Sequence, residues 1–174
     1  MDRLAHIRES IRDVPDFPKE GIIFKDITPV LQNKVLFAEV IDILAESVNG
    51  HKLDQIAGIE SRGFIFGAAV ATKLNVGFIP IRKPGKLPYK TFRIEYQLEY
   101  GTDALEIHQD AVSEGEHVLL MDDLLATGGT ALAAAKLLEQ CGGKVEKILF
   151  LIELEFLNGI DQLNGYNVQS LIKF

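Results

Sequence analysis

The sequence predicts an α/β fold in which helices cover both faces of a parallel, twisted sheet. Two observations predict it. Short apolar runs typical of buried strands alternate with stretches of helical spacing, and glycine-containing loops follow two of those runs, at residues 58–63 and 126–130. Strand–helix–strand units of this kind form parallel sheets, which bind ligands at the carboxyl ends of their strands. For a chain of 174 residues we expect one domain, residues 1–174.

The N-terminal part is expected to hold two helices separated by an irregular segment. Leu4, Ile7 and Ile11 have the spacing of a short amphipathic helix that stops before Pro15. Residues 15–29 contain Gly21 and three prolines and are expected to be irregular. Apolar residues at positions 36, 37, 40, 41 and 44 predict the second helix, and Asn49-Gly50 is a good stop for it.

Alternating strands and helices follow. We expect strands at residues 55–59, 77–81, 118–121, 148–153 and 168–172, with helices near residues 64–74 and 131–141. Apolar residues at positions 92, 94, 96, 98 and 100 alternate with polar ones, which predicts a half-buried strand that Gly101 ends. A partner strand at residues 104–108 would complete a hairpin.

Two adjacent carboxylates, Asp122 and Asp123, directly follow the apolar run at residues 118–121. A short loop then leads into the next helix. Free N–H groups at a helix start, beside glycines that allow close approach, form an anion site. The paired acids suit hydroxyl groups or a cation a few ångströms away. Together the two features indicate a ribose 5-phosphate, with its phosphate on Ala126, Thr127, Gly128, Gly129 and Thr130.

Other interpretations of this loop are weaker. The sequences G-x-x-x-x-G-K-[ST] and G-x-G-x-x-G of two common phosphate-binding motifs are absent. An ordinary buried strand followed by a helix with Thr130 as N-cap remains the simplest alternative.

Basic residues gather in one segment of an otherwise acidic chain. Five lie between Arg82 and Arg93, with no acidic residue among them, which favours binding of a polyanion such as pyrophosphate over a solvated basic loop. A second loop, Glu60-Ser61-Arg62-Gly63, should lie at the same sheet edge. Ser61 and Gly63 could simply cap a helix, but Arg62 offers donors matched to phosphate oxygens.

Composition excludes several classes of protein. The formal net charge of −7 argues against a nucleic-acid partner, and no apolar run is long enough for a membrane helix. The four histidines lack metal-ligand spacing, and the single Cys141 cannot form an internal disulfide. We therefore expect a cytoplasmic enzyme that acts on a small molecule.

Residues 118–130 resemble the signature of the type I phosphoribosyltransferase family, which binds phosphoribosyl diphosphate (PRPP). Four further segments are similar to the adenine-specific members of that family: residues 11–29, Glu60-Ser-Arg-Gly63, Lys86-Leu-Pro88 and Leu98-Glu-Tyr-Gly101. One departure is visible, because Lys25 stands where these members often have arginine. If that residue reads adenine through its backbone, the change is nearly silent.

The resemblance implies transfer of the phosphoribosyl group from PRPP to N9 of adenine, giving AMP and pyrophosphate. It assigns the ribose hydroxyls to Asp122 and Asp123, and the base to the main chain of Ile23 to Lys25 with Phe24 stacked on it. Pyrophosphate would be held by Mg²⁺ and by basic and hydroxyl side chains: Ser61, Arg62, Arg82, Lys83 and Lys86. The family's corresponding loop at residues 60–63 commonly contains a non-proline cis peptide.

Glu99 is the expected catalytic residue. Hypoxanthine-guanine enzymes have an aspartate where this chain has Ala126, so an acid directed at the purine must come from elsewhere. Strand alternation places Glu99 on the polar face of the hairpin with Arg93, Glu95 and Gln97, and the family's catalytic glutamate matches it. The alternative is a solvent-facing strand residue. We expect the segment at residues 82–108 to be a flexible loop and hairpin that closes over the site.

The resemblance also implies Mg²⁺ held mainly by substrate and water, with no metal site built from protein ligands alone, and a homodimer. Two alternative functions remain. One is a sister transferase acting on xanthine, guanine or orotate, which Phe24 and Ala126 argue against. The other is a non-catalytic PRPP sensor, which would need a nucleic-acid-binding module or a basic face.

Overall fold

The computed structural model describes residues 3–97 and 101–174, and the chain divides into two compact units, Met1–Ser47 and Val48–Phe174. Each unit is described by itself. That residues 1–174 form one domain stays a prediction. Among the described residues no helix is long and apolar enough to span a membrane.

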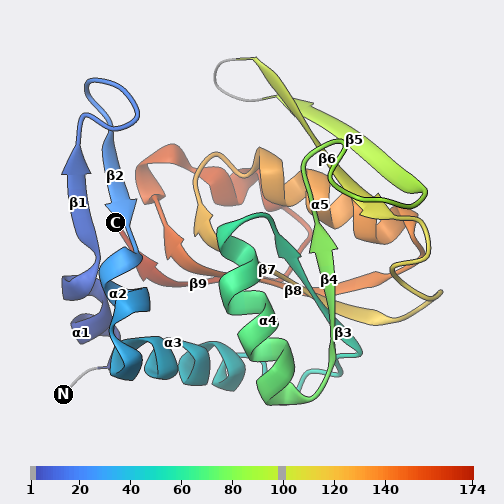
Figure 1. The fold of residues 1–174 in the computed structure, drawn as a ribbon, viewed down its shortest axis with the longest axis horizontal. Helices are drawn as coiled ribbons and strands as arrows, with labels where there is room; N and C mark the ends of the chain where they lie inside the picture. Colours follow the sequence, from blue (N-terminus) through green and yellow to red (C-terminus); the bar gives the residue numbers. More distant parts are fainter. Residues whose placement is uncertain (1–2, 98–100) are drawn as a thin grey trace. The chain divides into compact units, whose positions relative to one another are not determined.

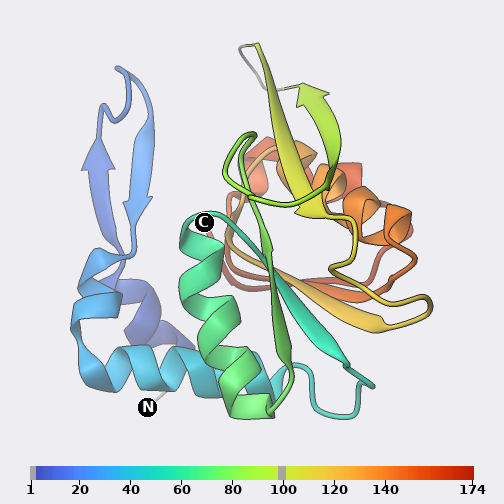
Figure 2. The ribbon, with the colours of Figure 1, turned by 45° about the vertical axis from the view of Figure 1, so that its right-hand side comes forward.

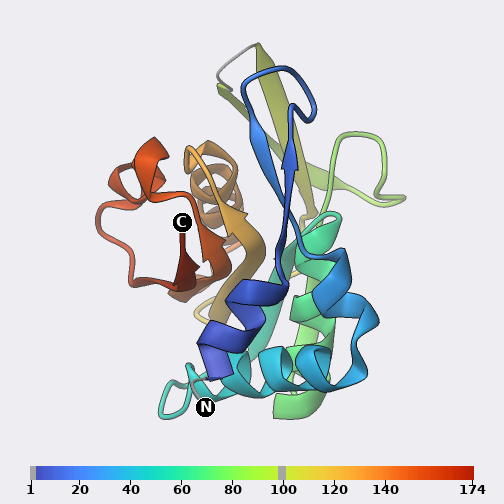
Figure 3. The same ribbon diagram turned by 90° about the vertical axis from the view of Figure 1, so that its left-hand side faces the viewer.

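The first unit consists of three helices and a two-stranded hairpin (Figure 3). Helix α3 begins after Asn33, whose side-chain oxygen accepts hydrogen bonds from the N–H groups of Val35 and Leu36 at 3.0 and 3.3 Å. The apolar positions predicted for this helix at 36, 40, 41 and 44 are buried. The elements are α1 (Arg3–Ser10), β1 (Arg12–Pro15), β2 (Ile23–Asp26), α2 (Thr28–Gln32) and α3 (Lys34–Glu46).

The expectation that residues 15–29 are irregular is wrong in part, because β2 pairs antiparallel with β1. The two strands are four residues each, β1 is mostly exposed and β2 mostly half-buried, and neither shows an apolar alternation that could have predicted it. Ion pairs hold the hairpin together: Arg12 contacts Asp26 at 3.0 Å, and Lys25 contacts Asp13 at 2.6 Å. Helix α2 starts in the same stretch, with a proline in its first turn.

The second unit is built on a five-stranded parallel sheet of order β4-β3-β7-β8-β9 (Figures 1 and 2). All five predicted core strands are present. The strand predicted at residues 118–121 continues to Leu125, so both aspartates lie inside it. The strands are β3 (Gln55–Ile59), β4 (Gly77–Ile81), β7 (His117–Leu125), β8 (Lys144–Glu153) and β9 (Val168–Lys173).

Helices α4 (Arg62–Leu74) and α5 (Gly129–Gln140) cover opposite faces of this sheet. Successive strand residues point to opposite faces. In β3, Ala57 and Ile59 join the buried cluster that includes Leu137 of α5. Gly58 faces the other way, where a Cβ atom would lie 3.0 Å from the carbonyl oxygen of Gly63 in α4. The prediction of helices on both faces of the sheet is confirmed.

A second hairpin, β5 (Thr91–Gln97) and β6 (Thr102–His108), packs on α5. Phe92, Ile94 and Tyr96 face the buried cluster, while the alternate residues are exposed, so the predicted half-buried strand is confirmed up to Gln97. Its predicted positions 98 and 100 lie outside the described residues. Two short 3-10 helices, η1 (Glu155–Leu157) and η2 (Gly159–Leu163), precede β9.

Candidate active site

The loop between β7 and α5 has the conformation expected for the predicted anion site. Helix α5 begins at Gly129, and Gly128, at φ +87°, is its N-cap in place of Thr130. In the described part of the chain, the backbone N–H groups of residues 126–131 donate to no protein acceptor. The carbonyl oxygen of Gly128 accepts from the N–H of Leu132 at 3.0 Å, as in the first helical turn. These N–H groups and the helix dipole favour a bound anion.

A segment that the sequence did not single out lies directly against this loop. A Cβ atom on Gly159, the first residue of η2, would lie 2.0 Å from the carbonyl oxygen of Ala126. A Cβ atom on Gly128 would lie 2.3 Å from the carbonyl oxygen of Gly159. One residue before the loop, the carbonyl of Leu125 accepts from the N–H of Leu154 at 3.0 Å. The backbone of residues 154–159 therefore packs directly on the backbone of residues 125–128. The only sequence signal was Asn158-Gly159, which is typical of any turn.

The two acids at the end of β7 are in different surroundings. Asp123 is 4% exposed, and its carboxylate pairs with the guanidinium of Arg62 at 2.9 Å. Asp122 is half-buried, and its Oδ1 accepts from the N–H of Asp123 at 2.9 Å. Burial, with the neighbouring Asp123 carboxylate, raises the pKa of Asp122 well above its usual value. Burial also raises the pKa of Asp123, and Arg62 opposes that rise.

A cavity of about 190 Å³ joins these groups. Arg62, both aspartates and the loop residues Ala126, Thr127, Gly128 and Thr130 line it. Donors for a phosphate and acceptors for hydroxyl groups therefore share one cavity.

The loop at residues 60–62 lies at the same sheet edge, as predicted. The Glu60–Ser61 peptide is cis, as the resemblance implies, and the Ser61 residue is exposed. A Cβ atom on Gly63 would lie 2.9 Å from Oδ1 of Asp122. This close packing brings the start of α4, and Arg62 with it, beside the two acids.

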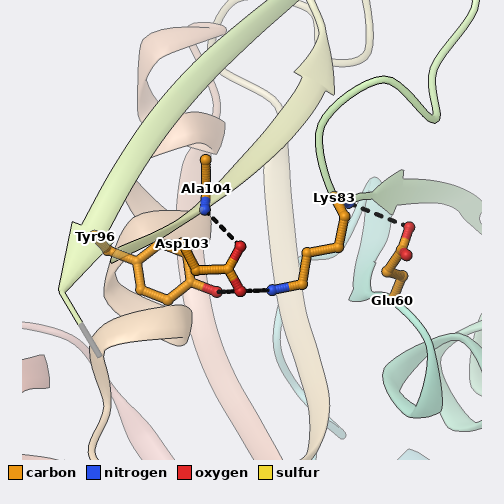
Figure 4. A network of polar contacts seen from close by, with 5 residues as sticks. All are labelled: Glu60, Lys83, Tyr96, Asp103 and Ala104. Atoms are coloured by element: carbon orange, nitrogen blue, oxygen red, sulfur yellow. Dashed lines mark hydrogen bonds and ion pairs between the residues drawn. The ribbon is translucent and has the colours of Figure 1, made fainter. Parts of the chain in front are cut away.

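The basic loop after β4 is tied to the loop at residues 60–62 by Glu60. Its Oε2 accepts from Nε of Arg82 at 2.8 Å and from the backbone N–H of Lys83 at 3.2 Å. The ammonium of Lys83 pairs with Asp103 and lies 3.2 Å from the Tyr96 hydroxyl (Figure 4). The Lys86 residue is exposed, and its carbonyl accepts from Arg82 at 3.3 Å. Arg82 and Lys83 thus lie by the predicted pyrophosphate loop, each with a carboxylate partner.

The remaining predicted residues belong to the first unit or lie outside the described residues. Ile23, Phe24 and Lys25 form most of β2 in the first unit, where the Phe24 ring meets that of Phe17 edge-on at 5.2 Å. Glu99 lies outside the described residues. The hairpin reaches the phosphate loop before that point, since a Cβ atom on Gly129 would lie 3.2 Å from the carbonyl oxygen of Gln97.

Comparison with known proteins identifies the family. Residues 26–155 match the phosphoribosyl transferase domain. The adenine phosphoribosyltransferase of Thermoanaerobacter pseudethanolicus is 58% identical over 171 residues, which are 98% of this chain and 99% of that protein. This chain belongs to the adenine phosphoribosyltransferase family.

Two solved adenine phosphoribosyltransferases share its fold. The T. pseudethanolicus crystal structure has a TM-score of 0.97 at 58% identity, covering 98% of this chain and 99% of that one. The Saccharomyces cerevisiae enzyme, solved with D-2,5-dideoxy-2,5-imino-altritol 1,6-bisphosphate and adenine, has a TM-score of 0.92 at 42% identity, covering 97% and 98%. The family and fold predicted from the sequence are confirmed, while the roles of individual residues stay predictions.

Proposed function

We propose that this chain transfers the 5-phosphoribosyl group from PRPP to N9 of adenine and releases AMP and pyrophosphate. The observation that carries the proposal is the N-terminus of α5 opening into the same cavity as two adjacent carboxylates, in a chain of this family. A phosphate with a vicinal diol a few ångströms away is the ligand that such a cavity fits.

The 5-phosphate would bind the N–H groups of residues 126–130, which donate to no acceptor among residues 3–97 and 101–174. The ribose hydroxyls would donate to Asp122 and Asp123. Because burial and like charge raise the pKa of Asp122, hydroxyl donors would stabilise the ionised carboxylate and relieve part of its unfavourable environment. Fixing both ends of the sugar would orient its anomeric carbon for attack.

The pyrophosphate leaving group would meet Ser61, Arg62, Arg82, Lys83 and Lys86. Mg²⁺, when bound with PRPP, would neutralise charge that builds on the leaving oxygens. Among the described residues no group of three or more metal-ligating side chains forms a cage, while Asp122 and Asp123 offer carboxylate oxygens. That donor set fits a cation carried mainly by substrate oxygens and water.

Adenine would stack on Phe24, with its Watson–Crick edge read by main-chain groups of Ile23 to Lys25. In β2 the side chain of Lys25 is already paired with Asp13, which favours backbone contact at this position. The transition state carries positive charge on the ribose. Glu99 would contact N7 of the purine and help to manage the N9 proton, and closure of the hairpin would exclude water that could hydrolyse the cation. We further propose a homodimer acting in the cytoplasm, on the strength of the family resemblance.

Turnover with a panel of bases tests the function. With PRPP and Mg²⁺, adenine should give AMP, while hypoxanthine, guanine, xanthine and orotate give little product. Product from a different base alone would favour a sister transferase. PRPP binding without turnover of any base would favour a non-catalytic sensor. Asp122→Asn, set against Asp161→Asn at an exposed residue, tests the sugar site: only the first should weaken PRPP binding.

A further inference from the structure

The side chain of Lys83 is held by the hairpin. Its ammonium pairs with the carboxylate of Asp103 in β6 and lies 3.2 Å from the hydroxyl of Tyr96 in β5. That hydroxyl is also 3.4 Å from the Asp103 carboxylate, so the three groups form one network (Figure 4). Asp103 accepts a further bond from the N–H of Ala104 at 2.7 Å, which fixes the orientation of the carboxylate.

The backbone of Lys83 is attached to a different part of the site. Its N–H donates to Glu60 at 3.2 Å, and Glu60 directly precedes Ser61 and Arg62 in the predicted pyrophosphate loop. Lys83 therefore joins two structures: its main chain stays on the loop at residues 60–62, and its side chain reaches the hairpin. A lysine side chain carries its compact charge on a flexible four-carbon stem, so the ammonium can change partners without movement of the backbone.

We propose that Asp103 is a positioning residue that holds the Lys83 ammonium on the hairpin in the empty enzyme and yields it to the pyrophosphate group of PRPP. This inference rests on the proposed role of Lys83 as a pyrophosphate ligand. One carboxylate carries a single negative charge, while pyrophosphate carries several, so the electrostatic attraction on the ammonium is stronger after the exchange. When it leaves Asp103, the hairpin loses a tie to the loop after β4.

The ion pair between Lys83 and Asp103 is weak enough for the ammonium to change partners. The side chains of Lys83 and Asp103 are 36% and 30% exposed. The pKa of Asp103 lies below its usual value: burial raises it, but the bonds from Lys83 and Ala104 outweigh that effect. Pairs exposed to this degree are worth little in water, so removing the competing carboxylate should change ligand affinity by only about two- to fivefold.

Titration calorimetry with pyrophosphate and Mg²⁺ on the full chain tests the proposal. Asp103→Asn, which keeps the side chain's shape, should tighten pyrophosphate binding by about two- to fivefold and lower KM for PRPP. Asp103→Glu, which restores a carboxylate, should return both values toward wild type. Glu95→Gln is the matched control, because it removes one charge from the same hairpin, where Glu95 pairs with Arg93 at 3.0 Å. It should leave both values unchanged.

A double-mutant cycle with Lys83→Ala separates the possible failures. We expect Lys83→Ala to weaken pyrophosphate binding at least tenfold, and Asp103→Asn to have no further effect in that background. If Lys83→Ala binds pyrophosphate normally, the assignment of Lys83 as a ligand fails, and this inference with it. If Lys83→Ala weakens binding but Asp103→Asn does not tighten it, or tightens it equally without Lys83, only the positioning role is overturned. Tyr96→Phe, which removes the third member, should shift affinity in the same direction as Asp103→Asn.

Discussion

The packing of Gly159 on the phosphate loop predicts that one methyl group, added outside the cavity, weakens PRPP binding. In Gly159→Ala the new Cβ atom would lie 2.0 Å from the carbonyl oxygen of Ala126 and 3.0 Å from the backbone nitrogen of Gly128. Non-bonded atoms are at their best separation near about 3.5 Å. The two backbones must therefore move apart by roughly 1 Å or more, and the binding N–H groups belong to one of them.

The expected magnitudes follow from that displacement. Overpacking of this kind costs about 1 to 3 kcal/mol, which for a protein of this size lowers Tm by about 2 to 12 °C. Misplacement of a binding group by about 1 Å can reduce activity on the order of a hundredfold. We expect the Kd for PRPP, measured by calorimetry at a temperature where the variant is folded, to rise by about ten- to a hundredfold.

Gly165→Ala is the matched control. Gly165 has φ +97° and no atom within 4 Å of the position of a Cβ, so alanine there costs about 1 to 2 kcal/mol of backbone energy without touching the loop. It should lower Tm and leave PRPP affinity unchanged. Gly128→Ala combines φ +87° with a contact at 2.3 Å to Gly159 and should bind PRPP worst. If Gly159→Ala binds PRPP as tightly as Gly165→Ala, the loop does not depend on this backbone contact.

Three further outcomes are expected. Burial and Asp123 raise the pKa of Asp122 above its ordinary 3.8, so folding favours the protonated carboxyl group, and stability is lost as pH rises from 3.8 through the raised pKa. Asp122→Asn should therefore raise Tm at pH 7.5 and lose this advantage toward pH 4. A Tm advantage that grows in acid would contradict the stated cause. The kcat/KM for adenine should exceed that for hypoxanthine by about 10⁴-fold, since a 6-oxo purine would leave buried donors and acceptors unpaired; comparable values would show that the base pocket is wrongly assigned. Glu99→Ala should lower kcat by about 10²- to 10⁴-fold with Tm and PRPP affinity nearly unchanged; near-normal turnover would remove Glu99 from the mechanism, and a large loss of Tm would indicate a structural role.

The core of the second unit could be predicted because its strands carry the strongest sequence signals. The strands at residues 55–59 and 77–81 are found with the expected bounds, since each is a short apolar run followed by a helix or a turn. The strand, loop and helix start at the phosphate loop could also be predicted, because two acids, two glycines and an apolar helix leave few local conformations. The N-cap of the following helix is Gly128, whose left-handed backbone favours glycine, and not Thr130, which belonged to the simpler alternative interpretation.

What could not be predicted depends on contacts between distant residues. The β1–β2 hairpin is held by charged pairs between its two short strands, and such pairs leave no apolar periodicity. The support of the phosphate loop by η2 requires Gly159 to meet a loop that ends thirty-one residues earlier, at Gly128, which no local pattern encodes. The basic loop was found as a charge cluster, but its partners Glu60 and Asp103 come from elements on either side of it.

Those partners explain how a chain with a net charge of −7 can hold a binding site for a polyanion. Three of the cations expected to bind pyrophosphate each face a carboxylate in the structure: Arg62 faces Asp123, Arg82 faces Glu60 and Lys83 faces Asp103. The charges of these three pairs cancel, so they do not present a bare cluster of positive charge that any anion could occupy. With the proposed site roles, PRPP binding would be an exchange of partners, in which the sugar hydroxyls replace Arg62 on Asp123 and phosphate oxygens bind the cations. A simple anion would supply only half of that exchange: it would take Arg62 from the buried Asp123 carboxylate and offer no hydroxyl group in its place, which is costly. The same acids would thus lower the affinity for phosphate alone and favour a ligand that carries both phosphates and a diol.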